Sequence, residues 1–176
     1  FGAYALVEAR LILGALVLLP FLVKARNQFT KDHWWKIVGI AAVNTAVPFT
    51  LFAWAALRAP AGIGAITNAM AVMFTALMAF VLYRERIESR RVVGLLLGFV
   101  GVAVLASGKT EGESVAAAAL AGTCAAFMYG IGGNLIPRHL VGIAPGAVAP
   151  ATLVCAAVWL APLAVVTWPD APIPAL

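Results

Sequence analysis

Residues 61–91, AGIGAITNAMAVMFTALMAFVLYRERIESRR, decide the fold class of this chain. Residues 61–83 form a run without a charged side chain, and a helix of about 20 such residues spans the apolar core of a bilayer. Arginines at four positions then follow closely, from Arg84 to Arg91, as in loops on the cytoplasmic side of a membrane. The stretch therefore predicts a transmembrane helix that ends in the cytoplasm.

Further apolar runs flank this one, and together they predict an all-α, polytopic transmembrane helix bundle. The expected spans cover residues 4–23, 37–57, 61–83, 92–107, 115–136 and 146–168. The composition agrees, because 64% of the residues are hydrophobic, 11% are charged and the mean hydropathy is +1.01, far from the values of a soluble domain. We expect a tight antiparallel hairpin around Arg58 and Pro60, and we expect Pro137 to close the fifth span.

The basic residues predict how the chain is oriented. Most of the 12 Lys and Arg residues lie in every second gap between the apolar runs, which places those gaps in the cytoplasm. These residues are Lys24, Arg26, Lys31, Lys36, Arg84, Arg86, Arg90, Arg91 and Arg138. None of these gaps holds a basic run long enough to follow a phosphate backbone, so nucleic acid is not an expected partner.

A weak internal repeat points to a particular class of membrane protein. Residues 10–23 align with residues 152–165, pairing Leu11 with Leu153 and Pro20 with Pro162. The two copies lie five spans apart and so have opposite orientations, as in transporters built from inverted repeats. We therefore expect about ten spans in two halves of five, with residues 1–108 as a first repeat lacking its first helix and residues 109–176 as the start of the second.

A family resemblance rests on residues 64–108. The stretch contains an apolar helix, the turn Tyr83-Arg84-Glu85-Arg86 and glycines spaced as in Gly94, Gly98 and Gly101. It resembles the end of the first repeat in EamA-type permeases of the drug/metabolite transporter superfamily. Glu85 matches the acid of that turn, and Arg10 resembles an Arg near the start of the family's second helix. Val72 stands where the family usually has a proline.

Polar residues inside the expected spans are candidates for a solute site, because hydrocarbon offers them no hydrogen-bond partner. Pro48 cannot donate to the carbonyl of Asn44, so this pair predicts a mid-membrane break that either faces a cavity or is satisfied by neighbouring helices. Asn68 and Thr75 are seven residues apart and share a helix face. They line a cavity or form a hydrogen bond to another helix.

Tyr129 and Asn134 belong to a glycine-rich part of the fifth span. Glycines allow another backbone to come close, so this part serves either helix packing or ligand contact. The predicted substrate-binding residues are Asn44, Asn68, Thr75, Tyr129 and Asn134.

Three charged residues have open interpretations. Arg10 either anchors the first span at the outer interface or belongs to a vestibule that attracts anionic or zwitterionic solutes. Glu8 lies two residues before Arg10 and so does not face it. Glu85 is either a solvated loop residue or pairs with a basic group to hold helix ends together.

These features favour a secondary transporter of small organic metabolites in the cell membrane. For a bacterial protein, this would be the inner membrane. The resemblance implies export of amino acids or related solutes, with nucleotide-sugar-type carriage or a non-transporting membrane subunit as alternatives. An enzyme is not expected, because His33 and His139 stand alone in separate loops and no phosphate-binding loop is present. The sequence indicates no cofactor and no metal site. The expected partners are the lipid bilayer and a small-molecule solute, and no feature indicates an oligomeric state.

Overall fold

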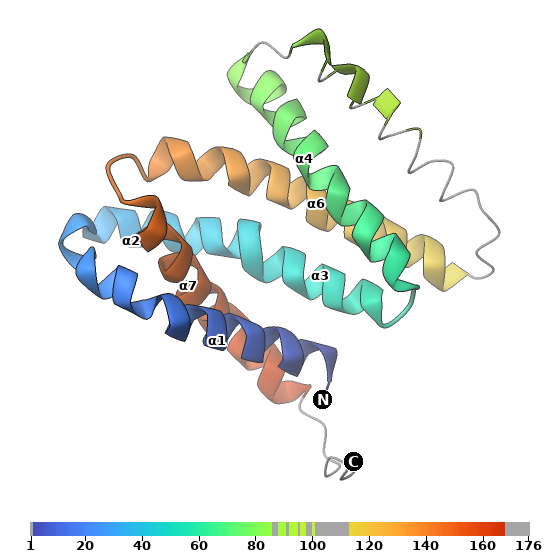
Figure 1. Cartoon of the computed structure of the whole chain (residues 1–176). Coiled ribbons are helices and arrows are strands. Elements are labelled where there is room, and N and C mark those ends of the chain that lie inside the picture. Colours follow the sequence, from blue (N-terminus) through green and yellow to red (C-terminus); the bar gives the residue numbers. More distant parts are fainter. Residues whose placement is uncertain are drawn as a thin grey trace.

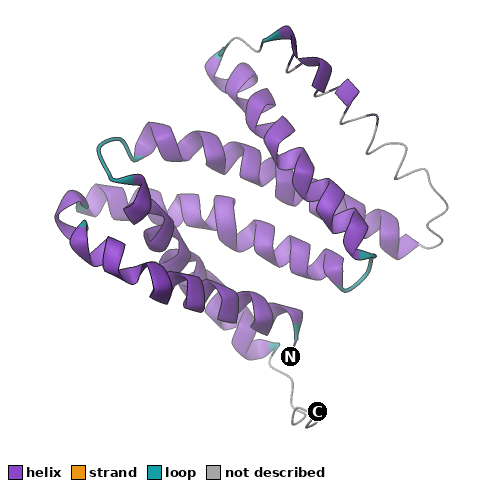
Figure 2. Cartoon of the chain, in the orientation of Figure 1, coloured by secondary structure: helices purple, strands orange, loops and turns teal. Residues whose placement is uncertain are grey.

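The computed structural model describes residues 2–85, 88–90, 92–94, 96–97, 100 and 113–167, and within these ranges it contains helices and no strand (Figures 1 and 2). In chain order the elements are α1 (Ala3–Lys24), the 3-10 turn η1 (Arg26–Gln28), α2 (Lys31–Ala41), the π-helical turn η2 (Ala42–Ala46), α3 (Val47–Ala56), α4 (Ala61–Tyr83), α6 (Glu113–His139) and α7 (Pro145–Val166).

Within the described ranges, 5 helical segments are long and apolar enough to cross a membrane. They are Ala3–Lys24, Lys31–Ala56, Ala61–Tyr83, Val115–His139 and Pro145–Val166. This confirms the all-α, polytopic transmembrane bundle. The predicted fourth span at residues 92–107 and the residues after 167 fall largely or wholly outside the described ranges.

Helix α2 begins at Lys31, earlier than the predicted start at Ile37. Thr30 caps it: its hydroxyl accepts a hydrogen bond from the amide of His33, and the ring of His33 accepts one from the amide of Thr30. Such a reciprocal cap satisfies amides that the first helical turn leaves free. The second span therefore extends beyond its apolar part into the basic loop.

The helix is not interrupted at Asn44 and Pro48, so the predicted break is wrong. The chain stays helical from α2 through η2 into α3. The amide of Val47 donates to the carbonyl of Ala42, five residues earlier. A wider π-helical turn relieves the clash between a proline ring and the preceding turn without ending the helix. Asn44 lies in this turn.

Pro137 does not close the fifth span, and this prediction is also wrong. Helix α6 continues through Pro137 to His139, and the amide of Leu140 still donates to the carbonyl of Ile136. A proline this near the C-terminus of a helix removes only a single bond of the last turns. The cost is small enough for the helix to continue.

The largest buried cluster joins α1, α2 and α7. Helices α1 and α7 lie side by side and antiparallel, with Gly2 near Thr167 and Gly14 near Leu153 (Figure 1). The amide of Ala144, just before α7, donates to the side-chain carbonyl of Gln28, just after α1, at 2.9 Å. The loops predicted to be cytoplasmic at residues 24–36 and 138–145 therefore meet at the same end of the bundle.

Helix α4 packs mainly against α6 and makes few contacts with α3, although a short turn joins α3 to α4 (Figure 1). The short turn of the predicted hairpin is therefore present, but its two helices do not pack closely along their length. Close approach favours α6, because Gly130 lies directly against the backbone of Phe74, whereas α3 carries bulky rings at Phe49 and Phe52. The divergence of α3 and α4 leaves room for a pocket at the outer end.

Candidate functional site

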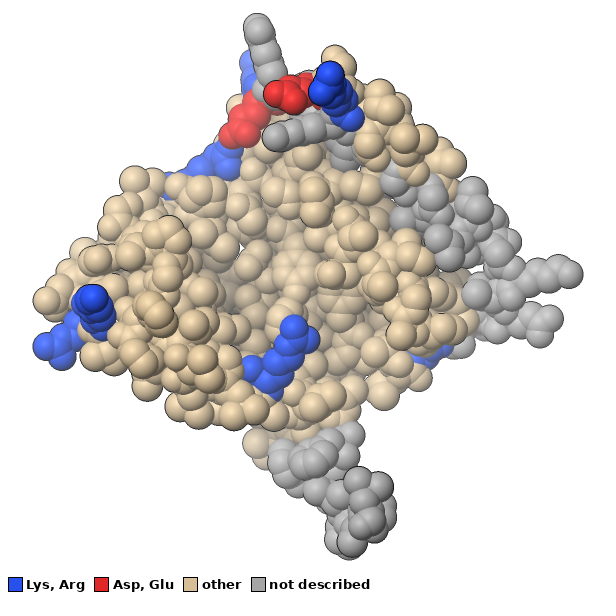
Figure 3. Space-filling model, viewed as in Figure 1, with Lys and Arg blue, Asp and Glu red and all other residues tan. Residues whose placement is uncertain are grey.

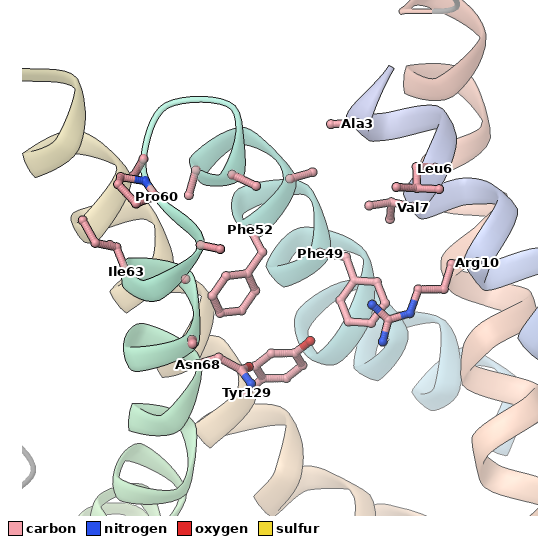
Figure 4. A pocket seen from close by; sticks show the side chains of 17 residues that line it. Ala3, Leu6, Val7, Arg10, Phe49, Phe52, Pro60, Ile63, Asn68 and Tyr129 are labelled. Carbon is pink, nitrogen blue, oxygen red and sulfur yellow. The ribbon is translucent and has the colours of Figure 1, made fainter. Parts of the chain in front are cut away.

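An outer pocket of about 570 Å³ lies among α1, α3, α4 and α6 (Figure 4). Its volume falls in the range of small-molecule sites. Its lining includes Ala59 and Pro60, in the turn between α3 and α4, and Ala61, the first residue of α4. The basic-residue pattern predicts that this turn faces outside, and we therefore call this pocket the outer pocket.

Aromatic rings form the inner wall of the outer pocket. Tyr129 of α6 stacks on Phe52 with ring centroids 6.1 Å apart, and it meets Phe49 edge to face at 6.4 Å. Phe49 and Phe52 are three residues apart on α3 and therefore point in similar directions. The rings present apolar faces, and the phenol adds a polar group at the pocket surface (Figure 4).

Polar side chains reach the outer pocket from two other helices. Asn68 of α4 and Arg10 of α1 both line it, and they lie on opposite sides of Tyr129 in Figure 4. The guanidinium carbon of Arg10 lies 5.6 Å from the centre of the Phe49 ring, within the range of a cation–π contact. The pocket thus combines a cation, an amide and a phenol with an apolar lining.

A second, inner pocket of about 760 Å³ lies nearer the cytoplasmic ends of α4 and α6. Thr75, Glu85 and Asn134 are its polar lining residues. The side-chain amide of Asn134 donates to the carbonyls of Thr75 at 2.9 Å and of Gly130 at 2.8 Å. The hydroxyl of Thr75 donates back to Ala71 in its own helix at 2.7 Å. Asn134 therefore joins the two helices while lining the pocket.

Arg138 contacts two of the residues that line the inner pocket, Asn134 and Glu85. Its guanidinium donates to the backbone carbonyl of Asn134 at 2.9 Å and to the side-chain oxygen of Asn134 at 3.1 Å. It also forms an ion pair with Glu85 and lies over the Tyr83 ring, 3.5 Å from the centroid. Of the two interpretations of Glu85, the structure favours pairing with a basic group over a solvated loop residue. The carboxylate of Glu85 pairs with Arg138 and so holds the end of α4 to α6.

Helix α6 supplies the close contacts that position both pockets. An added Cβ at Gly130 would lie 2.7 Å from the carbonyl carbon of Phe74, and an added Cβ at Gly132 would lie 2.4 Å from the Cβ of Asn44. These distances confirm that the glycines let other helices come close. Asn44 packs on Gly132 and is not among the residues that line either pocket.

The structure thus divides the sequence-predicted residues into groups. Asn68 and Tyr129 line the outer pocket, Thr75 and Asn134 are in contact at the inner one, and Asn44 lies where η2 packs on α6. Sequence reasoning missed Phe49, Phe52 and Arg138. The spacing of the two phenylalanines and the four-residue step from Asn134 to Arg138 were the available signals. In the described part of the chain, no three His, Cys, Asp or Glu side chains are grouped so as to hold a metal ion.

Comparison with known proteins gives a single positive finding. The family model described as "EamA-like transporter family" matches residues 1–107, which is more than half of the chain. No curated protein and no solved structure shows a significant match.

Proposed function

The chain belongs to the EamA-like transporter family, and from this premise we propose that it is a secondary transporter that exports amino acids or related small organic solutes. Members of this family are transporters of the drug/metabolite transporter superfamily rather than enzymes. The chain is accordingly a multi-pass integral membrane protein that meets the lipid bilayer and a small solute.

The observation that carries the proposal is the outer pocket. Its volume of about 570 Å³ suits a small organic molecule. Its lining offers a few polar groups among alanines and aromatic rings, which is the usual composition of a solute site. Neither a channel nor a structural subunit requires such a pocket.

We propose that the five polar residues mark a route along α4 and α6. Asn68 and Tyr129 would contact the solute first, in the outer pocket, and Thr75 and Asn134 would contact it in the inner pocket. Asn44 would take part when the contact between η2 and α6 at Gly132 loosens. In support, the two pockets share α4 and α6, and the ion pair between Arg138 and Glu85 joins the ends of these helices beside the inner pocket. We propose that this arrangement belongs to an outward-open state of an alternating-access cycle.

We also propose the repeat organisation expected from the sequence, with residues 1–108 in a first repeat and residues 109–176 in a second. The antiparallel packing of α1 against α7 supports it, because inverted repeats place equivalent helices in opposite directions. A carrier of nucleotide sugars remains the alternative within the superfamily. It is less well supported because a diphosphate calls for several cations, and Arg10 is the only basic residue among those that line the outer pocket.

The proposal is tested by comparing small solutes inside and outside cells that express the full-length protein or its Asn68→Ala variant. We expect at least one organic solute to accumulate outside cells with the wild-type protein and to accumulate less with the variant. Thr50→Ala serves as a matched polar control, because its hydroxyl donates within its own helix to Ala46 and it lines neither pocket. No solute difference with a correctly inserted wild-type protein would contradict export and favour a non-transporting subunit.

A further inference from the structure

We propose that the outer pocket selects organic carboxylates and that Arg10 is the residue that recognises the carboxylate group. This inference rests on the proposed function, since it names the substrate class of the same pocket. It goes beyond the five polar residues of the proposed route, which carry no positive charge.

The first observation is the position of the Arg10 side chain. Arg10 lies in the third turn of α1, and its guanidinium extends into the outer pocket toward Phe49 and Tyr129 (Figure 4). A side chain that only anchored the helix would extend away from the bundle toward the interface. The structure therefore favours the vestibule over the anchor for this residue.

The second observation is that the charge is not neutralised. No described residue forms an ion pair or a hydrogen bond with Arg10, whose ring contact with Phe49 is cation–π in character. Glu8 is not the ion-pair partner of Arg10, because it lies on another side of α1. The Oε2 atom of Glu8 is buried without a hydrogen-bond partner. Arg10 is exposed at the pocket, so its positive charge is available to an anionic group of a solute.

The third observation concerns what else surrounds the guanidinium. The lining residues of the outer pocket include no acidic side chain. In Figure 3 the acidic side chains visible on this face gather at its upper end, together with basic ones, and a basic side chain borders the hollow at the centre. A solute ammonium group would be repelled by Arg10 and would find no carboxylate among the lining residues, only the Asn68 carbonyl, the Tyr129 hydroxyl and the ring faces. The pocket thus distinguishes a carboxylate from an amine.

The remaining lining specifies the rest of the solute. Phe49, Phe52 and Tyr129 offer ring faces close to Arg10, and aromatic rings favour flat or apolar groups. A guanidinium binds a carboxylate through two parallel hydrogen bonds, which gives both strength and orientation. The favoured solute is therefore a monocarboxylate with an apolar, preferably planar body, and an amino group is not required.

The test measures binding of three probes to the purified full-length protein in detergent by isothermal titration calorimetry. The probes are 3-phenylpropanoate, phenylalanine and phenethylamine, which share a ring and differ in their charged groups. We expect 3-phenylpropanoate to bind at least as tightly as phenylalanine, and phenethylamine not to bind. Arg10→Gln should weaken binding of 3-phenylpropanoate about 10- to 100-fold, because a hydrogen-bonded charge is lost.

Two further variants make the test selective. Arg10→Lys keeps the charge but lacks the paired geometry, so its affinity should fall between those of the wild type and Arg10→Gln. Arg58→Gln removes the same charge from the outer turn, where Arg58 stacks on Trp54 at 4.0 Å and does not line the pocket. It should leave the affinity unchanged.

Equal binding of the amine and the acid, or unchanged affinity in a folded Arg10→Gln variant, would overturn the inference. Displacement of 3-phenylpropanoate by phosphatidylglycerol and not by other carboxylates would also overturn it, because Arg10 would then be a lipid site. A different result would show that the proposed transport function fails while the carboxylate inference holds. In that case carboxylates bind in the calorimeter through Arg10, but no solute crosses the membrane in cells.

Discussion

Substituting Gly130 by alanine tests how α6 positions the two pockets. Gly130 lies where α6 crosses α4, between Tyr129 of the outer pocket and Asn134 of the inner one. The added Cβ would lie 2.7 Å from both the carbonyl carbon and the Cβ of Phe74, and 2.9 Å from its carbonyl oxygen. Real contacts of this kind are longer, and backbone atoms cannot move aside as a flexible side chain can. The two helices must therefore separate.

Gly133 provides a matched comparison on the same helix. Its added Cβ would lie 3.6 Å from Thr75, which is an ordinary van der Waals contact. Both substitutions gain the same helix propensity, about 1 kcal/mol for glycine to alanine, so this gain cancels in the difference. Overpacking costs about 1–3 kcal/mol, and Gly130→Ala should therefore be less stable than Gly133→Ala by about that amount.

Thermal unfolding of both variants in the same detergent measures the difference. For a chain of this size, 1 kcal/mol corresponds to a change in Tm of about 2–4 °C. We expect Gly133→Ala to unfold at or above the wild-type temperature and Gly130→Ala to unfold several degrees below Gly133→Ala. Equal Tm values for the two variants, or a higher one for Gly130→Ala, would refute the close α4–α6 contact.

Other contacts yield further predictions. Asn134→Ala should destabilise the protein by about 0.6–1.7 kcal/mol, because it removes a hydrogen bond between membrane helices. Thr75→Val should have a smaller effect, because Asn134 bonds to the backbone carbonyl of Thr75; equal losses of Tm would contradict the assignment. In a double-mutant cycle, Glu85→Gln and Arg138→Gln should couple by about 0.2–1 kcal/mol, as expected for a partly exposed ion pair. Additive losses would show that this pair does not hold the cytoplasmic end.

The sequence alone predicted the class of fold and most helix positions, because long apolar runs with charged ends leave few alternatives in a membrane. Residues 61–83 illustrate this, since the predicted and observed helix coincide. Prolines were harder to interpret. Pro48 and Pro137 both read as interruptions, but a π-helical turn accommodates one and the helix end accommodates the other. Local propensity does not show how neighbouring turns adapt.

The candidate site was less predictable than the fold. Asn68 and Tyr129 were identified because polar groups are rare in apolar helices, yet nothing in their spacing indicated that they share a pocket with Arg10. That grouping depends on which helices pack together. Asn134 and Arg138 likewise belong together, but their link to Glu85 depends on how α4 meets α6.

The most direct test of the central claim, an outward-open pocket that binds the transported solute, is labelling of a cysteine at position 65. Ala65 lines the outer pocket, and the Ala65→Cys variant would be made in a protein whose Cys124 and Cys155 are replaced by alanine. A membrane-impermeant maleimide added outside should label it, and the transported solute should slow that labelling. Labelling of Arg58→Cys, outside the pocket, should not respond to the solute. Labelling of position 65 that requires access from the cytoplasm, or that the solute leaves unchanged, would contradict the account.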